Sequence, residues 1–187
     1  MLYSVWELAI KKTLFHPKAD ELSRLIFMLK IFRYEFVEKR PIVYLDESGF
    51  SVDAPREKGY SLRGEKCYAS KDWHARGRIN AIGAIMDFKL FNVCLFDCNI
   101  DSDVFYAWVN EELLPNTPQN AVIVLDNATF HKREDTLLAI QRKGHTIEFL
   151  PPYSPDLNPI ENKWAQAKSI RRKFGYTPEE LFIYAKI

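Results

Sequence analysis

Three carboxylate residues stand where a fold of strands and helices presents side chains together. Asp46 and Asp126 each close a short run of β-branched and aliphatic residues, and Glu161 follows a proline-punctuated segment that leads into a helix. Carboxylate oxygens are the ligands that Mg²⁺ and Mn²⁺ prefer. Two such ions about 3.5–4 Å apart stabilise the entering and leaving oxygens of a phosphoryl displacement. We therefore expect Asp46, Asp126 and Glu161 to be metal ligands. Without a metal, we also expect a raised pKa in at least one of them, because neighbouring carboxylates repel one another.

The two aspartates also have a structural interpretation. An aspartate that follows a strand is often a turn former or a helix cap. Beside Asp46, Glu47 is an equally plausible acid. Strand alternation favours Asp46, because it places Val43 and Leu45 on one face and Asp46 on the other.

Glu161 has a sharper structural alternative. Asn158 is a good N-cap, Pro159 suits the first helical position, and Glu161 then stands at the third. That spacing is typical of a capping box, in which Glu161 would accept a hydrogen bond from the backbone N–H of Asn158. The prolines at 151, 152, 155 and 159 favour a further role, because they stiffen a loop that presents one side chain.

Charge and composition limit the other functions of the chain. Of its 187 residues 47% are hydrophobic, as in a globular domain, and the formal net charge is only +1. Nucleic-acid binding must therefore come from local basic clusters, and one such cluster follows Glu161. The basic residues that we expect to contact DNA are Lys132, Lys163, Lys168, Arg171 and Arg172. The sequence has no P-loop, dinucleotide glycine pattern or Gly-x-Ser-x-Gly elbow, so no rival site competes with the three acids.

Other reactive side chains have simpler explanations. His131 follows Asp126 closely, but a lone histidine is more often hydrogen-bonded or exposed than a ligand. Cys94 and Cys98 lack the second pair of a zinc site, so we expect buried thiols. An odd number of cysteines without a secretory signal indicates a reducing compartment. The most apolar run, Leu25–Leu29, is too short to span a bilayer, so we expect no membrane partner.

The hydrophobic pattern predicts an α/β fold. A helix capped by Asp20 precedes a strand at 42–46, for which we expect an exit turn at 47–49. The later elements are expected as a hairpin of 78–86 with 92–100, a helix from 101 or 102 to 114, a strand at 121–125, a helix at 132–143, a strand at 146–150, a helix at 158–173 and a short helix from Pro178. The last two strands should be parallel, because a helix connects them.

Three sequence blocks resemble the signature blocks of bacterial IS630-type transposases, which belong to the IS630/Tc1/mariner superfamily of DDE endonucleases. The blocks are Asp46-Glu-Ser-Gly-Phe50, Leu125-Asp-Asn-Ala-Thr-Phe-His-Lys132 and Leu150-Pro-Pro-Tyr-Ser-Pro-Asp-Leu-Asn-Pro-Ile-Glu-Asn-Lys-Trp164. The 34 residues at 127–160 between the second and third acids match the spacing of that superfamily. The resemblance covers roughly residues 10–175.

The resemblance implies an RNase H-like (retroviral integrase-like) fold, with a mixed five-stranded sheet flanked by helices. It also implies cut-and-paste transposition with two Mg²⁺ or Mn²⁺ ions held by Asp46, Asp126 and Glu161. Water would cleave double-stranded DNA at the transposon ends, and the freed 3′-hydroxyl would attack target DNA, typically at TA. Such a protein would act in the bacterial cytoplasm, at the nucleoid.

The resemblance further divides the chain into two parts. Residues 41–187 would form the catalytic domain, and residues 1–40 would be a helical remnant of the DNA-binding region with a linker helix. The family normally begins with helix-turn-helix modules, so we expect a truncated chain: a second reading frame that needs a separately encoded helix-turn-helix polypeptide, a decayed fragment, or an excised catalytic domain. It could also form a homodimer. The alternative is a catalytically silent remnant that only binds DNA or transposase subunits.

Overall fold

The computed structural model describes residues 17–51, 62–65 and 77–185. The strands are β1 (Ile42–Ser51), β2 (Arg78–Met86), β3 (Lys89–Phe96), β4 (Val122–Leu125) and β5 (Thr146–Phe149). The helices are α1 (Glu21–Phe32), α2 (Ser102–Trp108), α3 (Leu114–Asn116), α4 (Glu134–Arg142), α5 (Ile160–Phe174) and α6 (Pro178–Tyr184). Single π-helical turns, η1 (Arg33–Val37) and η2 (Val109–Leu113), extend α1 and α2. Within these described ranges, no helix is long and apolar enough to cross a membrane.

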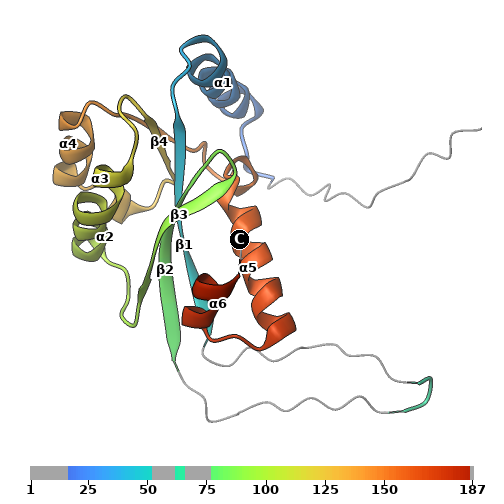
Figure 1. Ribbon diagram of the computed structural model, residues 1–187. Helices are drawn as coiled ribbons and strands as arrows, with labels where there is room; N and C mark the ends of the chain where they lie inside the picture. Colours follow the sequence, from blue (N-terminus) through green and yellow to red (C-terminus); the bar gives the residue numbers. More distant parts are fainter. Residues whose placement is uncertain (1–16, 52–61, 66–76, 186–187) are drawn as a thin grey trace, which may run out of the picture.

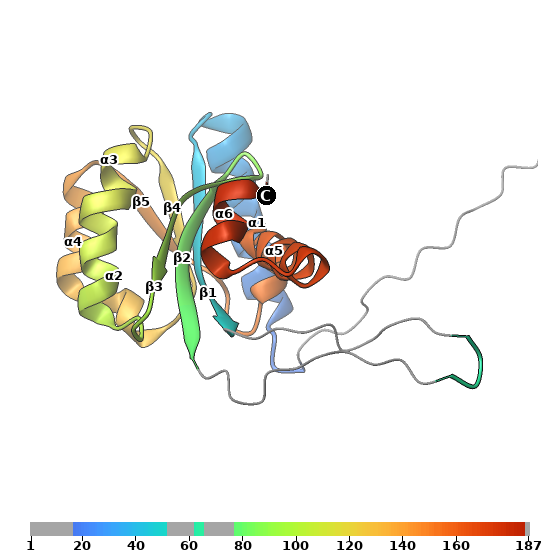
Figure 2. The ribbon, with the colours of Figure 1, turned by 60° about the horizontal axis from the view of Figure 1, so that its bottom comes forward.

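The expected mixed sheet is confirmed, with the strand order β3-β2-β1-β4-β5. β1 is antiparallel to β2 and parallel to β4, and β4 is parallel to β5. Helices α2, α3 and α4 lie on one face of the sheet, and α5 and α6 lie on the other (Figures 1 and 2). The antiparallel and parallel halves of the sheet therefore meet at β1.

Strand β4 is buried over its whole length because helices cover both faces of the sheet. Ile123 and Leu125 pack into the core that includes Phe105 of α2. Val122 and Val124 face the other way and pack with Phe27 of α1. This fully apolar run ends at the polar residues that begin the loop after β4, so that loop starts at the carboxyl end of the strand.

Strand β1 is longer than predicted, and the expected exit turn at 47–49 is wrong. β1 pairs with β4 only over Ile42–Tyr44, but its pairing with β2 runs from Tyr44 to Ser51. The antiparallel partner supplies hydrogen bonds that keep the chain extended past the point where β4 diverges. Asp46 therefore lies within β1, two residues beyond the end of the parallel pairing.

Helix α5 is held against the sheet by one large aromatic side chain. Trp164 is buried, and its ring makes edge-to-face contacts with Phe50 and Phe182. Opposite Asp46 in the β1–β2 register stands Gly83, where a Cβ atom would lie 2.7 Å from Cη2 of Trp164. Only glycine allows this close approach, which brings the start of α5 next to the middle of β1.

Candidate active site

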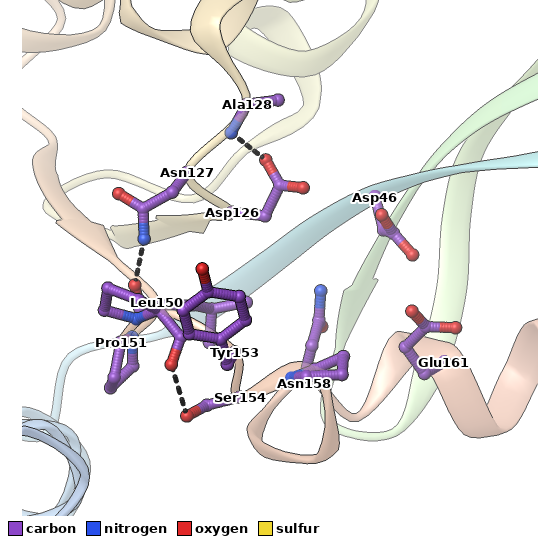
Figure 3. Close-up of a pocket in the computed structure, with 12 residues that line it drawn as sticks. Asp46, Asp126, Asn127, Ala128, Leu150, Pro151, Tyr153, Ser154, Asn158 and Glu161 are labelled. Atoms are coloured by element: carbon purple, nitrogen blue, oxygen red, sulfur yellow. Dashed lines mark hydrogen bonds between the residues drawn. The ribbon is translucent and has the colours of Figure 1, made fainter. Parts of the chain in front are cut away.

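A pocket of about 240 Å³ lies where β1, β4, the proline-rich loop and α5 meet. Its lining includes all three predicted acids, Asp46, Asp126 and Glu161, together with every residue of 150–155. Figure 3 shows the carboxylates of Asp46 and Glu161 turned toward one another, with Asp126 to one side. Acids that are distant in the sequence are thus brought to one cavity.

Asp46 reaches this pocket from the α5 face of the sheet. Val43 and Leu45 pack into the core on the opposite face, as strand alternation predicts. Burial, followed by repulsion from Glu161, Glu47 and Asp126, raises the pKa of Asp46 to about 8. The expected raised pKa is confirmed, and it identifies a place where a positive charge would be stabilised.

Asp126 follows the last residue of β4 and is held by hydrogen bonds on one oxygen. Its Oδ1 accepts the backbone N–H of Ala128 at 2.7 Å and lies 2.6 Å from Nδ1 of His131. The hydrogen bond from His131 outweighs burial and, with the Ala128 bond, lowers the pKa of Asp126. Asp126 is therefore ionised, in contrast to Asp46.

His131 is a fully buried residue that joins two acids. Its Nδ1 faces Asp126, and its Nε2 lies 2.8 Å from Oε1 of Glu47. Burial lowers the pKa of His131, but the hydrogen bonds with Asp126 and Glu47 raise it to about 9. Because both ring nitrogens face carboxylate oxygens, the ring is an imidazolium that donates to both. This role of His131 is not predicted by the sequence, in which the available signal is its position five residues after Asp126.

The hydrogen bond that the capping-box alternative required of Glu161 is not formed. Helix α5 begins at Ile160, whose backbone N–H donates to Oδ1 of Asn158 at 3.3 Å, but the backbone N–H of Asn158 donates to the carbonyl of Pro155 and not to Glu161. The buried Asn158 side chain donates to the carbonyl of Leu45 at 3.1 Å. Asn158 thus ties the loop to β1 beside Asp46, and the Glu161 carboxylate stays turned toward the pocket (Figure 3).

The proline-rich loop is fixed at both of its ends. Near its start, the Asn127 side chain donates to the carbonyl of Leu150. Further along, Asp156 accepts two hydrogen bonds from Arg24 of α1. Tyr153 has a φ of 57°, in the left-handed region that is uncommon for an aromatic residue. A loop held in this way presents its side chains at defined positions, as a site requires.

Comparison with known proteins identifies the family. The family described as DDE superfamily endonuclease matches residues 41–180, about three quarters of the chain. The chain belongs to the DDE superfamily endonucleases. The transposable element Tc3 transposase of Caenorhabditis elegans is 27% identical over 148 residues, which cover 72% of this chain and 45% of that protein.

Two solved structures of the Mos1 transposase share the fold of this DDE family member. The Mos1 paired-end complex with left transposon end has a TM-score of 0.67 at 15% identity, covering 89% of this chain and 54% of that one. The mariner Mos1 paired end complex with Mg has a TM-score of 0.65 at 16% identity, covering 96% and 60%. The fold is therefore RNase H-like, as expected, and the chain spans about half the length of the relatives that it matches.

The donor set of this DDE family member suits a hard divalent cation, since three carboxylates line one pocket and one of them has a raised pKa. Within the described part of the chain, however, no three histidine, cysteine, aspartate or glutamate side chains lie close enough to share one ion. A common ion therefore requires the carboxylates to move closer than they lie here.

Four of the five predicted DNA-contacting residues fall into three groups. Lys168 and Arg172 follow Glu161 by seven and eleven positions, so they share its face of α5. Lys163 lies on another side of the helix, and Lys132 stands in η3 (Thr129–Lys132) with its Nζ over the Phe149 ring. Those that keep a DNA role in our proposal are Lys132, Lys163, Lys168 and Arg172.

Arg171 corrects the predicted DNA-contacting set. Its side chain is buried, and it donates hydrogen bonds to the carbonyls of Tyr176 and Ser51. Helical periodicity explains the difference, because Arg171 follows Trp164 by seven residues and shares its buried face. Arg171 therefore joins α5 to the end of β1.

Two cysteines of this DDE family member, Cys94 and Cys98, lie within the described residues. Cys94 is half-buried and Cys98 is exposed, so the expectation of buried thiols is wrong for Cys98. Both thiols are free. Cys98 follows the end of β3, where the chain leaves the sheet. Cys67, Tyr60, Tyr68 and Trp73 lie outside the described residues.

Proposed function

We propose that this chain is a transposase catalytic domain that cleaves DNA at transposon ends and transfers the strand to target DNA. The observation that carries the proposal is that Asp46, Asp126 and Glu161 line one pocket at the junction of β1, β4 and α5. The family match to DDE endonucleases supports the same chemistry. Residues 41–187 would form the catalytic domain, and 1–40 would join it to the DNA-binding region.

The three acids would act together in the proposed reaction. Asp46, Asp126 and Glu161 would hold two Mg²⁺ or Mn²⁺ ions. The chemistry supplied by such ions is activation of water or a 3′-hydroxyl and neutralisation of charge on the leaving 3′ oxygen. Asp46 would lose its proton when a cation enters, because the cation offsets the repulsion that raises its pKa. The rigid loop before α5 would keep Glu161 at the reacting phosphate.

Double-stranded DNA would lie along α5. Lys168 and Arg172 continue the face of the helix on which Glu161 stands, so a phosphate backbone that reaches the pocket would pass them. Lys163 and Lys132 would contact neighbouring phosphates. These contacts give affinity without sequence preference, so recognition of terminal repeats would need a helix-turn-helix region, in this polypeptide or in a separate one.

The proposal extends to the biological setting. The three sequence blocks favour an IS630-type element, with target insertion at TA. Two copies of the chain would pair two transposon ends, as cut-and-paste transposition requires. The protein would act in the bacterial cytoplasm, where the nucleoid DNA lies.

The test is metal-dependent nicking of supercoiled plasmid. Purified protein should convert supercoiled to open-circular DNA with Mn²⁺ and not with a chelator, and Asp46→Asn, Asp126→Ala and Glu161→Gln should each abolish the reaction. Asp97→Asn is the matched control, because Asp97 is exposed and outside the pocket. Absence of nicking together with no Mn²⁺-induced rise in Tm would support the alternative, a catalytically silent remnant that acts only as a DNA- or subunit-binding domain.

A further inference from the structure

Two consecutive residues of β1 reach the Asp126 region from opposite faces of the sheet. Asp46 enters the pocket from the α5 face. Glu47 points to the other face, where its Oε1 accepts a hydrogen bond from Nε2 of His131 at 2.8 Å. His131 in turn donates from Nδ1 to Oδ1 of Asp126 at 2.6 Å. A continuous hydrogen-bonded chain therefore runs from β1 through His131 to the acid at the end of β4.

The His131 ring is locked in its orientation. It is fully buried, and its centroid lies 4.4 Å from the Phe105 ring and 4.2 Å from the Phe130 ring. Both nitrogens are used, so a flip or rotation of the ring would break two charge-assisted hydrogen bonds inside an apolar cluster. The ring thus transmits the position of Glu47 to Asp126.

These contacts limit what Asp126 can offer. Its Oδ1 already accepts hydrogen bonds from Ala128 and His131, which leaves Oδ2 as the oxygen available to a cation. Glu47, whose Oε1 is held by His131, does not line the pocket. Of the two adjacent acids that the sequence left open, Asp46 faces the pocket and Glu47 faces the histidine.

We propose that His131 and Glu47 are positioning residues, which hold Asp126 so that one of its oxygens binds metal. This inference rests on the proposed function, because it requires Asp126 to be a ligand. Groups that hydrogen-bond to metal ligands orient them, and their loss typically weakens metal binding by about 10–100-fold. Glu47 acts only through His131, so its effect must disappear when His131 is absent.

Calorimetric titration with Mn²⁺ tests this dependence. Relative to the wild-type protein, His131→Ala and Glu47→Ala should each raise the Kd for Mn²⁺ by about 10–100-fold. The double variant should bind no more weakly than His131→Ala alone. Glu111→Ala, which removes an exposed acid outside the pocket, should leave the Kd unchanged. Further weakening in the double variant would overturn the inference, because it would make Glu47 a direct ligand.

A milder variant separates positioning from folding. His131→Ala opens a cavity among aromatic rings, whereas Glu47→Gln keeps an oxygen that can accept from Nε2. Glu47→Gln should recover most of the Mn²⁺ affinity that is lost in Glu47→Ala. Both variants should show the same Tm in chelator. Equal Kd values of the two variants for Mn²⁺ would overturn the inference. Failure of the proposed function is distinct, since the wild-type protein would then show no Mn²⁺ binding that depends on Asp46.

Discussion

Arg24 and Asp156 form a two-pronged ion pair that joins α1 to the proline-rich loop. Nη1 of Arg24 lies 2.9 Å from Oδ1 of Asp156, and Nη2 lies 2.7 Å from Oδ2. The Arg24 side chain is only 14% exposed, so the pair is partly shielded from water. A planar guanidinium that binds both oxygens of a carboxylate fixes its direction as well as its distance. The helix before the sheet thus braces the loop that leads to Glu161.

Breaking this ion pair should free the proline-rich loop from α1 while destabilising the fold only slightly. Arg24→Ala should lower the free energy of unfolding by about 0.5–1 kcal/mol in urea denaturation at pH 7. The hydrogen bond from Arg24 lowers the pKa of Asp156, so the stabilisation is present above the ordinary pKa of 3.8 and is lost as the pH falls through the lower folded-state value. The exchanged pair, Arg24→Asp with Asp156→Arg, should recover part of the loss.

The matched control is Arg33→Ala, which removes an exposed ion pair with Glu38 that does not reach the loop. It should change the free energy of unfolding by less than Arg24→Ala and leave the binding of Mn²⁺ unaltered. If Arg24→Ala changes Mn²⁺ binding no more than Arg33→Ala does, the geometry of the loop does not depend on α1.

Asp46 should make the metal-free protein less stable at alkaline pH. Its pKa of about 8 in the folded state exceeds the ordinary value of 3.8, so the folded protein binds the proton more tightly than the unfolded chain. That contribution is fully present below pH ~4 and is lost as the pH rises through about 8. In chelator at pH 9, Asp46→Asn should therefore exceed the wild type in free energy of unfolding by on the order of 2 kcal/mol.

Urea denaturation of both proteins at pH 6 and pH 9 checks the sign of this effect. The advantage of Asp46→Asn should grow between the two pH values, whereas Asp97→Asn should follow the wild type throughout. Parallel curves for Asp46→Asn and the wild type would contradict the raised pKa.

Local rules predicted the elements that depend on neighbouring residues. Asp101 caps α2 by accepting the N–H groups of Asp103 and Val104, as its sequence position indicates. The alternation of Val43, Leu45 and Asp46 also predicted which face of β1 carries the acid. In both cases the signal lies within a few residues of the feature, so tertiary contacts only reinforce it.

Features set by distant partners were not predictable in this way. The length of β1 depends on β2, the role of Glu47 depends on His131, and no local pattern encodes either pairing. Asn158 caps the start of α5 as its position predicts, because its Oδ1 accepts the Ile160 N–H at 3.3 Å, but no local pattern shows that its Nδ2 donates to the carbonyl of Leu45 in β1. The spacing of Asp126 and Glu161 could be recognised only by resemblance to other proteins.

Gly83 should be intolerant of even one added carbon. Gly83→Ala places a Cβ 2.7 Å from the Trp164 ring, and overpacking of this kind costs about 1–3 kcal/mol in unfolding free energy. Because Trp164 belongs to the helix that carries Glu161, the shift should also weaken Mn²⁺ binding. Trp164→Phe in the same chain shortens the ring and should make the double variant more stable than the sum of the two single effects. If the effects of the two substitutions on the free energy of unfolding are strictly additive, the strain in Gly83→Ala does not arise from contact with Trp164.

Lys168 and Arg172 should contribute to DNA affinity through charge alone. Each alanine substitution should weaken binding to unrelated duplexes equally and reduce the slope of log K against log salt by about 0.9. Fluorescence anisotropy over a salt series measures both quantities. Lys89→Ala, at the exposed first residue of β3, is the control and should leave the slope unchanged. A loss of affinity that depends on DNA sequence would indicate base contacts instead.

The order of the strands has a consequence for the newborn protein. β1 carries Asp46, but its neighbour β4 and the helix with Glu161 are synthesised much later. Long-range pairings of this kind form late, after the intervening chain has folded back. Under the proposed function, a ribosome-bound or prematurely terminated chain would be harmless to its host's genome, because nuclease activity would arise only once α5 had docked.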